Sequence, residues 1–257
     1  MEVDSGTTRF AKNAEVILPI ASITKLMTAL VVIESGASLT EWLKVTDWDA
    51  AQAKNAYSRI RIDSQAKRAD LLRIALMSSE NRAAFNLGVH YRGGVQGLVN
   101  AMNTKAAALG MSDTHFADPT GLSTDNKSSA RDLAKMVIAA HAHPELQKYS
   151  TTRQHTVNFQ QPRYRLGYGN TNPLLGGSRW QVFLTKTGYL REAGRCLVMV
   201  TRIDGKPIAV VLLNSFGKRS PLGDAGRIRR WLEEGIRSEV ASAAKAHEQR
   251  VSSALGL

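Results

Sequence analysis

The chain has one cysteine among its 257 residues, so it cannot form an internal disulfide bond. Cys196 lies in the apolar run "RCLVMV", which favours a buried strand residue over a reactive thiol. No apolar run approaches the roughly 18 residues of a transmembrane helix. The polar start "MEVDSG" is not typical of a signal peptide. These absences exclude a disulfide framework and a membrane-spanning helix as the basis of the fold.

The sequence also lacks zinc-finger spacing, an aromatic ribonucleoprotein signature and a Gly-rich phosphate loop. It does have an excess of positive charge, because 34 basic and 22 acidic residues give a net charge of +12. The densest basic cluster, "GRIRRW" at 226–231, is typical of one face of a helix. This balance suits an anionic partner such as a nucleic acid, a membrane surface or an acidic polymer.

The order of the hydrophobic patterns predicts an α/β (α+β) fold. The helix that begins at Ser22 is apolar nearly all round, so we expect it at the centre of the core. From about residue 151 the pattern changes to strand-like alternation, and 195–215 predicts a hairpin that turns at Asp204-Gly205. Further helices are predicted at 68–91 (broken at "SSEN"), 95–109, 130–143 and 222–240, and further strands at 151–159 and 180–189.

We expect a single domain over 1–257, because the sequence has no internal repeat and no long linker. An antiparallel sheet flanked by helices would carry an inserted all-helical lobe at about 40–150. Pro144 is expected just past the end of the preceding helix. The Ala- and Ser-rich segment 241–257 is expected to be a frayed or disordered tail.

Ser22 and Lys25 stand three residues apart where the apolar helix begins. Residues three apart share a helix face, so the lysine could be the base for the serine. The alternative is an N-cap serine followed by an ordinary surface lysine. The S-x-x-K pattern is common, and this chain also contains it at Ser64/Lys67, Ser215/Lys218 and Ser242/Lys245. The pattern alone therefore does not establish a catalytic serine.

Two further motifs occur once each. Ser79-Glu80-Asn81 falls at the predicted break between two helices, and Lys186-Thr187-Gly188 falls on a predicted strand. The ordered trio S-x-x-K, S-x-N and K-T-G is the signature of penicillin-binding proteins and class A β-lactamases. Taken separately, Ser79 could cap the following helix, and the K-T-G could be a strand end with a bulge. The order of all three favours the joint functional interpretation.

These residue types suit acyl transfer through a serine nucleophile. Ser22 would attack, and Lys25 would be its base once burial or a nearby cation lowers the lysine pKa. Lys186 would be that cation. The backbone N–H groups of Ser22 and Tyr189 could form an oxyanion hole, helped by the positive potential of the helix N-terminus.

The remaining motif residues would handle the substrate. Ser79 would relay a proton to the leaving amine, and Asn81 would hold Lys25 and a substrate amide. Lys186 and Thr187 would bind polar groups of the substrate, including a carboxylate. Gly188 would let the substrate backbone lie close to the strand.

Beyond the trio, the chain resembles the low-molecular-mass penicillin-binding proteins. Within them it is similar to the D-alanyl-D-alanine endopeptidases of the penicillin-binding protein seven type. The resemblance extends from about residue 10 to 235. The matching stretches are "PIASITKLMTALVV", "YSRIRI", "LLRIALMSSENRAA", "MNTKAAALGMSDTHFADPTGLS", "SARDLAKM", "NTNPLL", "LTKTGY", "AGRCLVM" and "FGK".

The resemblance implies a β-lactamase/transpeptidase-like fold and a periplasmic serine peptidase whose signal peptide has been removed. Such an enzyme cuts D-alanyl cross-links in peptidoglycan through an acyl-enzyme. The resemblance also implies covalent inhibition by β-lactams and the use of no metal or cofactor. Peripheral association with the anionic cell wall or the inner membrane would then use the basic surface.

One departure from the family bears on specificity. Many relatives have a hydroxyl residue two places after the K-T-G glycine, where this chain has Leu190. The loss of that hydroxyl weakens the expectation of strict carboxypeptidase activity. Arg191 could contact a terminal carboxylate instead, or it could be a surface residue. No stretch matches the loop that carries the deacylation glutamate of class A β-lactamases, so rapid β-lactam hydrolysis is not expected.

Three alternatives to an endopeptidase stay open. The first is a D-alanyl-D-alanine carboxypeptidase or weak β-lactamase on the same fold. The second is a β-lactam or muropeptide sensor that stays acylated, or an inactive scaffold, although the trio is intact. The third is a nucleic-acid binder, for which salt-sensitive DNA binding would survive Ser22→Ala. We expect no nucleic-acid partner.

Overall fold

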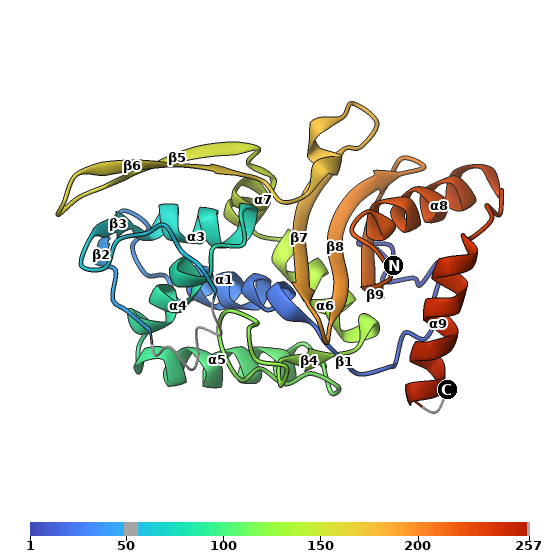
Figure 1. The fold of residues 1–257 in the computed structure, drawn as a ribbon, viewed down its shortest axis with the longest axis horizontal. Coiled ribbons are helices and arrows are strands. Elements are labelled where there is room, and N and C mark those ends of the chain that lie inside the picture. Colours follow the sequence, from blue (N-terminus) through green and yellow to red (C-terminus); the bar gives the residue numbers. More distant parts are fainter. Residues whose placement is uncertain (49–55, 256–257) are drawn as a thin grey trace.

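The computed structural model describes residues 1–48 and 56–255. A central antiparallel sheet has the strand order β7–β8–β9 (Figure 1). The turn between β8 and β9 has positive φ at Asp204 (48°) and Gly205 (74°), as a tight hairpin requires. The predicted hairpin is therefore confirmed. The three strands are β7 (Val182–Leu190), β8 (Gly194–Ile203) and β9 (Lys206–Ser215).

The middle strand, β8, is buried on both faces. Alternate residues of a strand point to opposite faces. Leu197 and Met199 join a small apolar cluster with Ala225 of α8 (Ser220–Glu234), whereas Val198 and Val200 belong to the main core. Burial on both faces explains the continuous apolar run of this strand, and Cys196 is buried as predicted.

Helix α1 (Thr24–Glu34) runs through the middle of the molecule (Figure 1), and every residue from Thr24 to Val32 is buried. A short 3-10 helix, η1 (Ala21–Ile23), precedes it. Among the described residues, five helices contact α1, which is why its apolar side chains extend nearly all round. They are α3 (Arg68–Met77), α4 (Asn81–Val89), α5 (Gly94–Ala108), α6 (Ala130–His141) and α7 (Pro144–Thr151).

The prediction of an all-helical lobe over 40–150 is wrong in one respect, because this region also contains short strands. Such strands are too short to show alternation in the sequence. Strand β2 (Trp42–Lys44) pairs with β3 (Gln65–Lys67), and β4 (Lys127–Ser128) pairs with β1 (Leu18–Pro19). A separate hairpin of β5 (Gln154–Phe159) and β6 (Tyr164–Gly169) projects from the body (Figure 1), and only its first strand was predicted.

Pro144 lies just past the end of α6, as predicted, and it begins a further helix that was not predicted, α7 (Pro144–Thr151), because proline suits the first turn of a helix. Two other helix predictions need correction. Helix α8 ends at Glu234 and not at 240, because Gly235 takes a left-handed conformation with φ of 70°. The segment expected to be a frayed or disordered tail forms α9 (Ser242–Leu255), and its alanines favour a helix.

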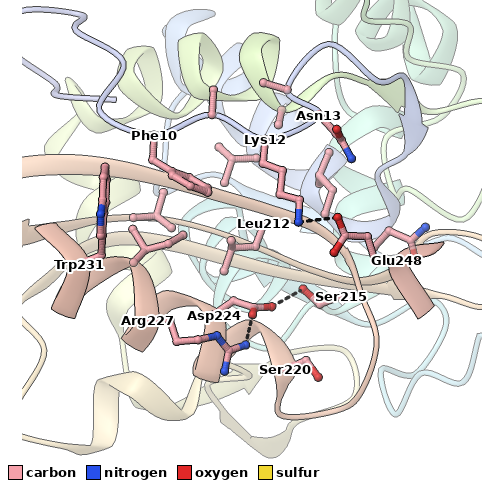
Figure 2. A pocket seen from close by; sticks show the side chains of 18 of the residues that line it. Phe10, Lys12, Asn13, Leu212, Ser215, Ser220, Asp224, Arg227, Trp231 and Glu248 are labelled. Carbon is pink, nitrogen blue, oxygen red and sulfur yellow. Dashed lines mark hydrogen bonds and ion pairs between the residues drawn. The ribbon is translucent and has the colours of Figure 1, made fainter. Parts of the chain in front are cut away.

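A cavity of about 950 Å³ lies away from the predicted site. Segments of the N-terminus, β9, α8 and α9 enclose it, and Figure 2 shows Phe10 and Trp231 at one end and the Lys12–Glu248 ion pair at the other. None of Ser22, Lys25, Ser79, Asn81 and residues 186–188 lines this cavity. In the described part of the chain, no helix is long and apolar enough to cross a membrane.

Candidate active site

Ser22 lies in η1, two residues before the first residue of α1, the helix that carries Lys25. Lys25 Nζ lies 2.9 Å from Ser22 Oγ, within hydrogen-bonding distance. The N-cap of α1 is Ile23, and no side chain caps the helix. The alternative of an N-cap serine followed by a surface lysine is therefore wrong, and the pair has the contact that a nucleophile and its base require.

Lys25 is fully buried and has two more partners. Its Nζ donates to Asn81 Oδ1 (2.6 Å) and to the Thr120 carbonyl (2.5 Å). Burial lowers the pKa of Lys25 to about 7, although the negative charges of Asp118 and Glu80 oppose this shift. A neutral amine donates two hydrogens and accepts one. The Asn81 and Thr120 oxygens only accept, so they take both hydrogens of a neutral Lys25 amine. Its lone pair is then free to accept from the Ser22 hydroxyl.

The loop that supplies the Thr120 carbonyl is built around Asp118. Its carboxylate accepts five hydrogen bonds, from Thr120 N and Oγ1, Gly121 N, Ser123 N and Asn126 Nδ2. Gly121 has φ of 80°, and a Cβ there would lie 2.0 Å from the Ala21 carbonyl oxygen. The loop is thus fixed against the residue before Ser22. The sequence analysis gave this loop no role, although its Asp-Pro-Thr-Gly run is typical of a turn.

Ser79 and Asn81 lie at the junction of α3 and α4. Ser79 has φ of 61°, an unusual value for a residue other than glycine, and it adjoins a small pocket of about 250 Å³. Glu80 caps α4, because its Oε2 accepts the Ala83 N–H at 2.6 Å. The alternative in which Ser79 is the cap is therefore wrong. Asn81, the first residue of α4, contacts Lys25 as predicted.

The Lys186-Thr187-Gly188 segment lies inside β7, at the edge of the sheet. Its pairing with β8 is regular, and the one irregularity of β7 lies between Val182 and Leu184, so the strand-end bulge is wrong. A Cβ on Gly188 would lie 3.1 Å from the Ile20 carbonyl oxygen and 3.2 Å from Ser22 N. The small residue therefore lets β7 lie directly against the nucleophile.

Lys186 is buried, and its Nζ donates to the Thr187 carbonyl at 2.8 Å. Burial, followed by the charge of Lys25, lowers the pKa of Lys186 well below its ordinary value. We expected Lys186 to be the cation that lowers the Lys25 pKa, and here the structure differs. Burial, and not the charge of Lys186, lowers the pKa of Lys25, whereas the charge of Lys25 adds to the effect of burial on the pKa of Lys186.

Thr171 is a residue that the sequence analysis missed. Its Oγ1 lies 2.6 Å from Thr187 Oγ1, and its N–H donates to the Met77 carbonyl at 2.8 Å. It thus ties β7 to the end of α3, two residues before Ser79. The signal was the stretch "NTNPLL", which the resemblance included without giving any of its residues a function.

Two further residues of β7 differ in exposure. Tyr189 is 53% exposed, and the Arg195 guanidinium lies 3.7 Å from the centre of its ring. Leu190 packs partly buried against the main core, whereas Arg191 is exposed.

A buried lysine that contacts a serine, an asparagine that contacts the lysine and an adjacent edge strand form the arrangement expected of a serine acyl-transfer enzyme. The family model of peptidase S11, D-alanyl-D-alanine carboxypeptidase, matches residues 1–217. This chain belongs to that family.

Relatives agree with this assignment. A D-alanyl-D-alanine endopeptidase of Pseudomonas aeruginosa is 47% identical over 95% of this chain and 79% of its own. The Streptomyces K15 DD-transpeptidase structure superposes with a TM-score of 0.82 and 26% identity, over 90% of this chain and 94% of the other. The ampicillin-bound penicillin-binding protein D2 of Listeria monocytogenes gives a TM-score of 0.74 and 28% identity, over 88% and 92%. The predicted penicillin-binding fold is confirmed.

Proposed function

We propose that this protein is a D-alanyl-D-alanine endopeptidase that hydrolyses the peptide cross-links of peptidoglycan. The observation that carries the proposal is the buried Lys25, whose pKa of about 7 lets it accept a proton from Ser22 Oγ at 2.9 Å. The peptidase S11 match and the similar endopeptidase of Pseudomonas aeruginosa support the substrate.

The first half-reaction acylates Ser22. As Oγ bonds to the D-alanyl carbonyl carbon, its proton passes to Lys25. The N–H groups of Ser22 and Tyr189 would hold the oxyanion, because β7 lies directly against Ser22 N. The carbon–nitrogen bond then breaks, and the proton on Lys25 reaches the leaving amine through Ser79. Water next hydrolyses the ester, with Lys25 again as the base.

A β-lactam would enter the same path, with its ring nitrogen as the leaving group. The nitrogen stays tethered to the acyl group, so covalent inhibition follows if deacylation is slow. The similarity to the ampicillin-bound Listeria protein supports this part of the proposal.

Leu190 favours the endopeptidase over the carboxypeptidase. Its side chain packs against the core and offers no hydroxyl to a terminal carboxylate. A carboxypeptidase remains the second candidate because the family description names that activity.

The decisive experiment is a digest of purified muropeptides that contain cross-linked dimers and pentapeptide monomers, resolved by mass. We expect dimers to become monomers with the wild-type protein and not with Ser22→Ala. Ser242→Ala, from the S-x-x-K of α9, is the matched control and should stay active. Loss of one D-alanine from the pentapeptide with intact dimers would make the protein a carboxypeptidase. If neither changes while a penicillin still labels Ser22, the protein would be a sensor.

We also propose that the protein acts in the periplasm, where its substrate would lie. Its net charge of +12 suits peripheral contact with the anionic wall or the inner membrane. Co-sedimentation with purified cell-wall sacculi and with anionic vesicles should fall as salt rises from about 50 to 500 mM. Salt-independent sedimentation would contradict the electrostatic attraction.

A further inference from the structure

The projecting hairpin of β5 and β6 carries an excess of positive charge. Residues 146–191, which include both of its strands, contain no acidic residue but seven lysines and arginines. Two of the seven, Arg163 and Arg165, are exposed at the start of β6. Unbalanced charge on a projecting element is typical of a surface that meets an anionic partner.

A second basic segment lies against the same strand. The backbone N–H of Arg61 donates to the Tyr164 hydroxyl at 2.9 Å, and Arg59 Nη2 donates to the Gly167 carbonyl at 2.6 Å. Four exposed arginines therefore lie along β6. We call this set the arginine edge: Arg59, Arg61, Arg163 and Arg165.

Tyrosine rings of β6 hold two of these side chains. The Arg61 guanidinium lies 4.7 Å from the centre of the Tyr164 ring, and that of Arg59 lies 5.1 Å from the centre of the Tyr168 ring. Stacking fixes a guanidinium and leaves N–H groups free for an anion. A carboxylate can then bind through two parallel hydrogen bonds, and less side-chain entropy is lost on binding.

The carboxylates of neighbouring segments are already used. Asp63 pairs with Lys44 at 2.8 Å, and Asp70 pairs with His155 at 2.7 Å. Within the described part of the chain, no carboxylate forms an ion pair with the arginine edge. An anion for these four guanidinium groups therefore has to come from a partner.

The hairpin is open on its outer face, and its base adjoins the active site. A Cβ at Gly167 or Gly169 would have nothing within 4 Å. Strand β6 leads to Thr171, whose Oγ1 lies 2.6 Å from Thr187 Oγ1 of the K-T-G segment. The six residues of β6 span about 20 Å. A polymer with one of its bonds at Ser22 would therefore extend along the hairpin.

We propose that the arginine edge binds carboxylates of peptidoglycan peptides that are not being cleaved, and so holds the polymer beside the active site. This inference rests on the proposed function, because peptidoglycan supplies free carboxylates at the ends of peptides that are not cross-linked. The wall is favoured over the membrane because Thr171 joins the hairpin directly to the active site. Several weak contacts with one polymer act together to give firm binding.

The test measures sedimentation of the protein with purified sacculi, in a Ser22→Ala background so that no bond is cut. The edge variant carries three substitutions: Arg61→Gln, Arg163→Gln and Arg165→Gln. The control variant removes three exposed arginines that lie in or between α8 and α9, at the opposite end of the molecule (Figure 1): Arg230→Gln, Arg237→Gln and Arg250→Gln. Both variants lose three positive charges.

The edge variant should bind sacculi about 10-fold more weakly than the parent at about 50 mM salt, as expected from the loss of three exposed ion pairs. The control variant should stay within about twofold of the parent, and the difference should disappear at about 500 mM salt. With Ser22 restored, hydrolysis of dilute sacculi by the edge variant should fall by the same factor. Acylation by a fluorescent penicillin should be unchanged, which would show that the active site is intact.

The outcomes separate the two proposals. If the wild-type protein cleaves no cross-links in sacculi, the proposed function fails. If it cleaves them but the edge and control variants bind sacculi equally, the arginine edge proposal is overturned, because total charge then accounts for binding. It is also overturned if the edge variant keeps its binding to sacculi and loses binding to vesicles of phosphatidylglycerol and phosphatidylethanolamine, because the partner would then be the membrane.

Discussion

The rate of acylation of this enzyme should depend on the fraction of Lys25 that is neutral. The lysine can accept the Ser22 proton only when it is neutral, and its pKa is about 7. At pH 5, two units lower, roughly one molecule in a hundred has neutral Lys25. The second-order rate constant of acylation should therefore fall about tenfold per pH unit below pH 7, and it should level off above about pH 8.

Asp118→Asn tests the cause of this profile. The negative charge of Asp118 raises the Lys25 pKa, so its removal should move the acidic limb of the profile to lower pH. The asparagine keeps one oxygen for the Thr120 and Gly121 N–H groups. Asp125→Asn is the control, because Asp125 is exposed in the same loop and pairs with Lys127. It should leave the profile unchanged.

Stopped-flow acylation by a fluorescent penicillin between pH 5 and 9 measures these rate constants. A rate that does not change between pH 5 and 7 would refute the assignment of Lys25 as the base. So would a profile that Asp118→Asn moves to higher pH, or that it moves no further than Asp125→Asn does. Circular dichroism at each pH shows whether a variant has lost its fold rather than its base.

Three further predictions concern the surroundings of the site. Gly121→Ala should abolish penicillin labelling, because its Cβ would lie 2.0 Å from the Ala21 carbonyl oxygen. Gly110 also has positive φ, but a Cβ there would have nothing within 4 Å. Gly110→Ala should therefore stay active and lower the free energy of unfolding, measured in urea, by about 1–2 kcal/mol. Thr171→Val removes the 2.6 Å contact with Thr187, so it should lower kcat/KM for D-alanyl peptides several-fold. The free energy of unfolding should change by no more than about 1 kcal/mol. Equal kcat/KM for the two proteins would show that the contact does not affect catalysis. Cys196 should react with a thiol reagent at pH 8 only after unfolding, because it is buried and its pKa is raised to about 11; rapid labelling of the native protein would contradict this.

The elements that the sequence predicted best are those that packing makes distinctive. Helix α1 and strand β8 are surrounded by the core, so their long apolar runs predict buried elements without knowledge of what packs against them. The hairpin turn at Asp204-Gly205 needs residues that tolerate positive φ, which is a local signal. The short strands β2 and β3 form only through each other, and no local pattern marked them.

The motif residues were found because the chemistry requires their types, but the motifs did not show how the site is held. The Thr120 carbonyl acts through the backbone, so its side chain gave no sign of its role. Thr171 joins two segments that are distant in sequence, and a single threonine carries no such information. Contacts of this kind depend on the assembled fold.

The two lysines show why residue identity alone gave the wrong electrostatics. Both are needed in the signature, and the sequence suggested that Lys186 activates Lys25 by its charge. Burial disfavours both ammonium groups, and the charge of Lys25 further disfavours the charged form of Lys186. The carboxylates of Asp118 and Glu80 partly offset the effect of burial on Lys25. A substrate carboxylate at β7 would favour the charged form of Lys186, and that charge would then lower the Lys25 pKa. On this reasoning Lys186 becomes the activating cation only after a substrate that carries a carboxylate has bound.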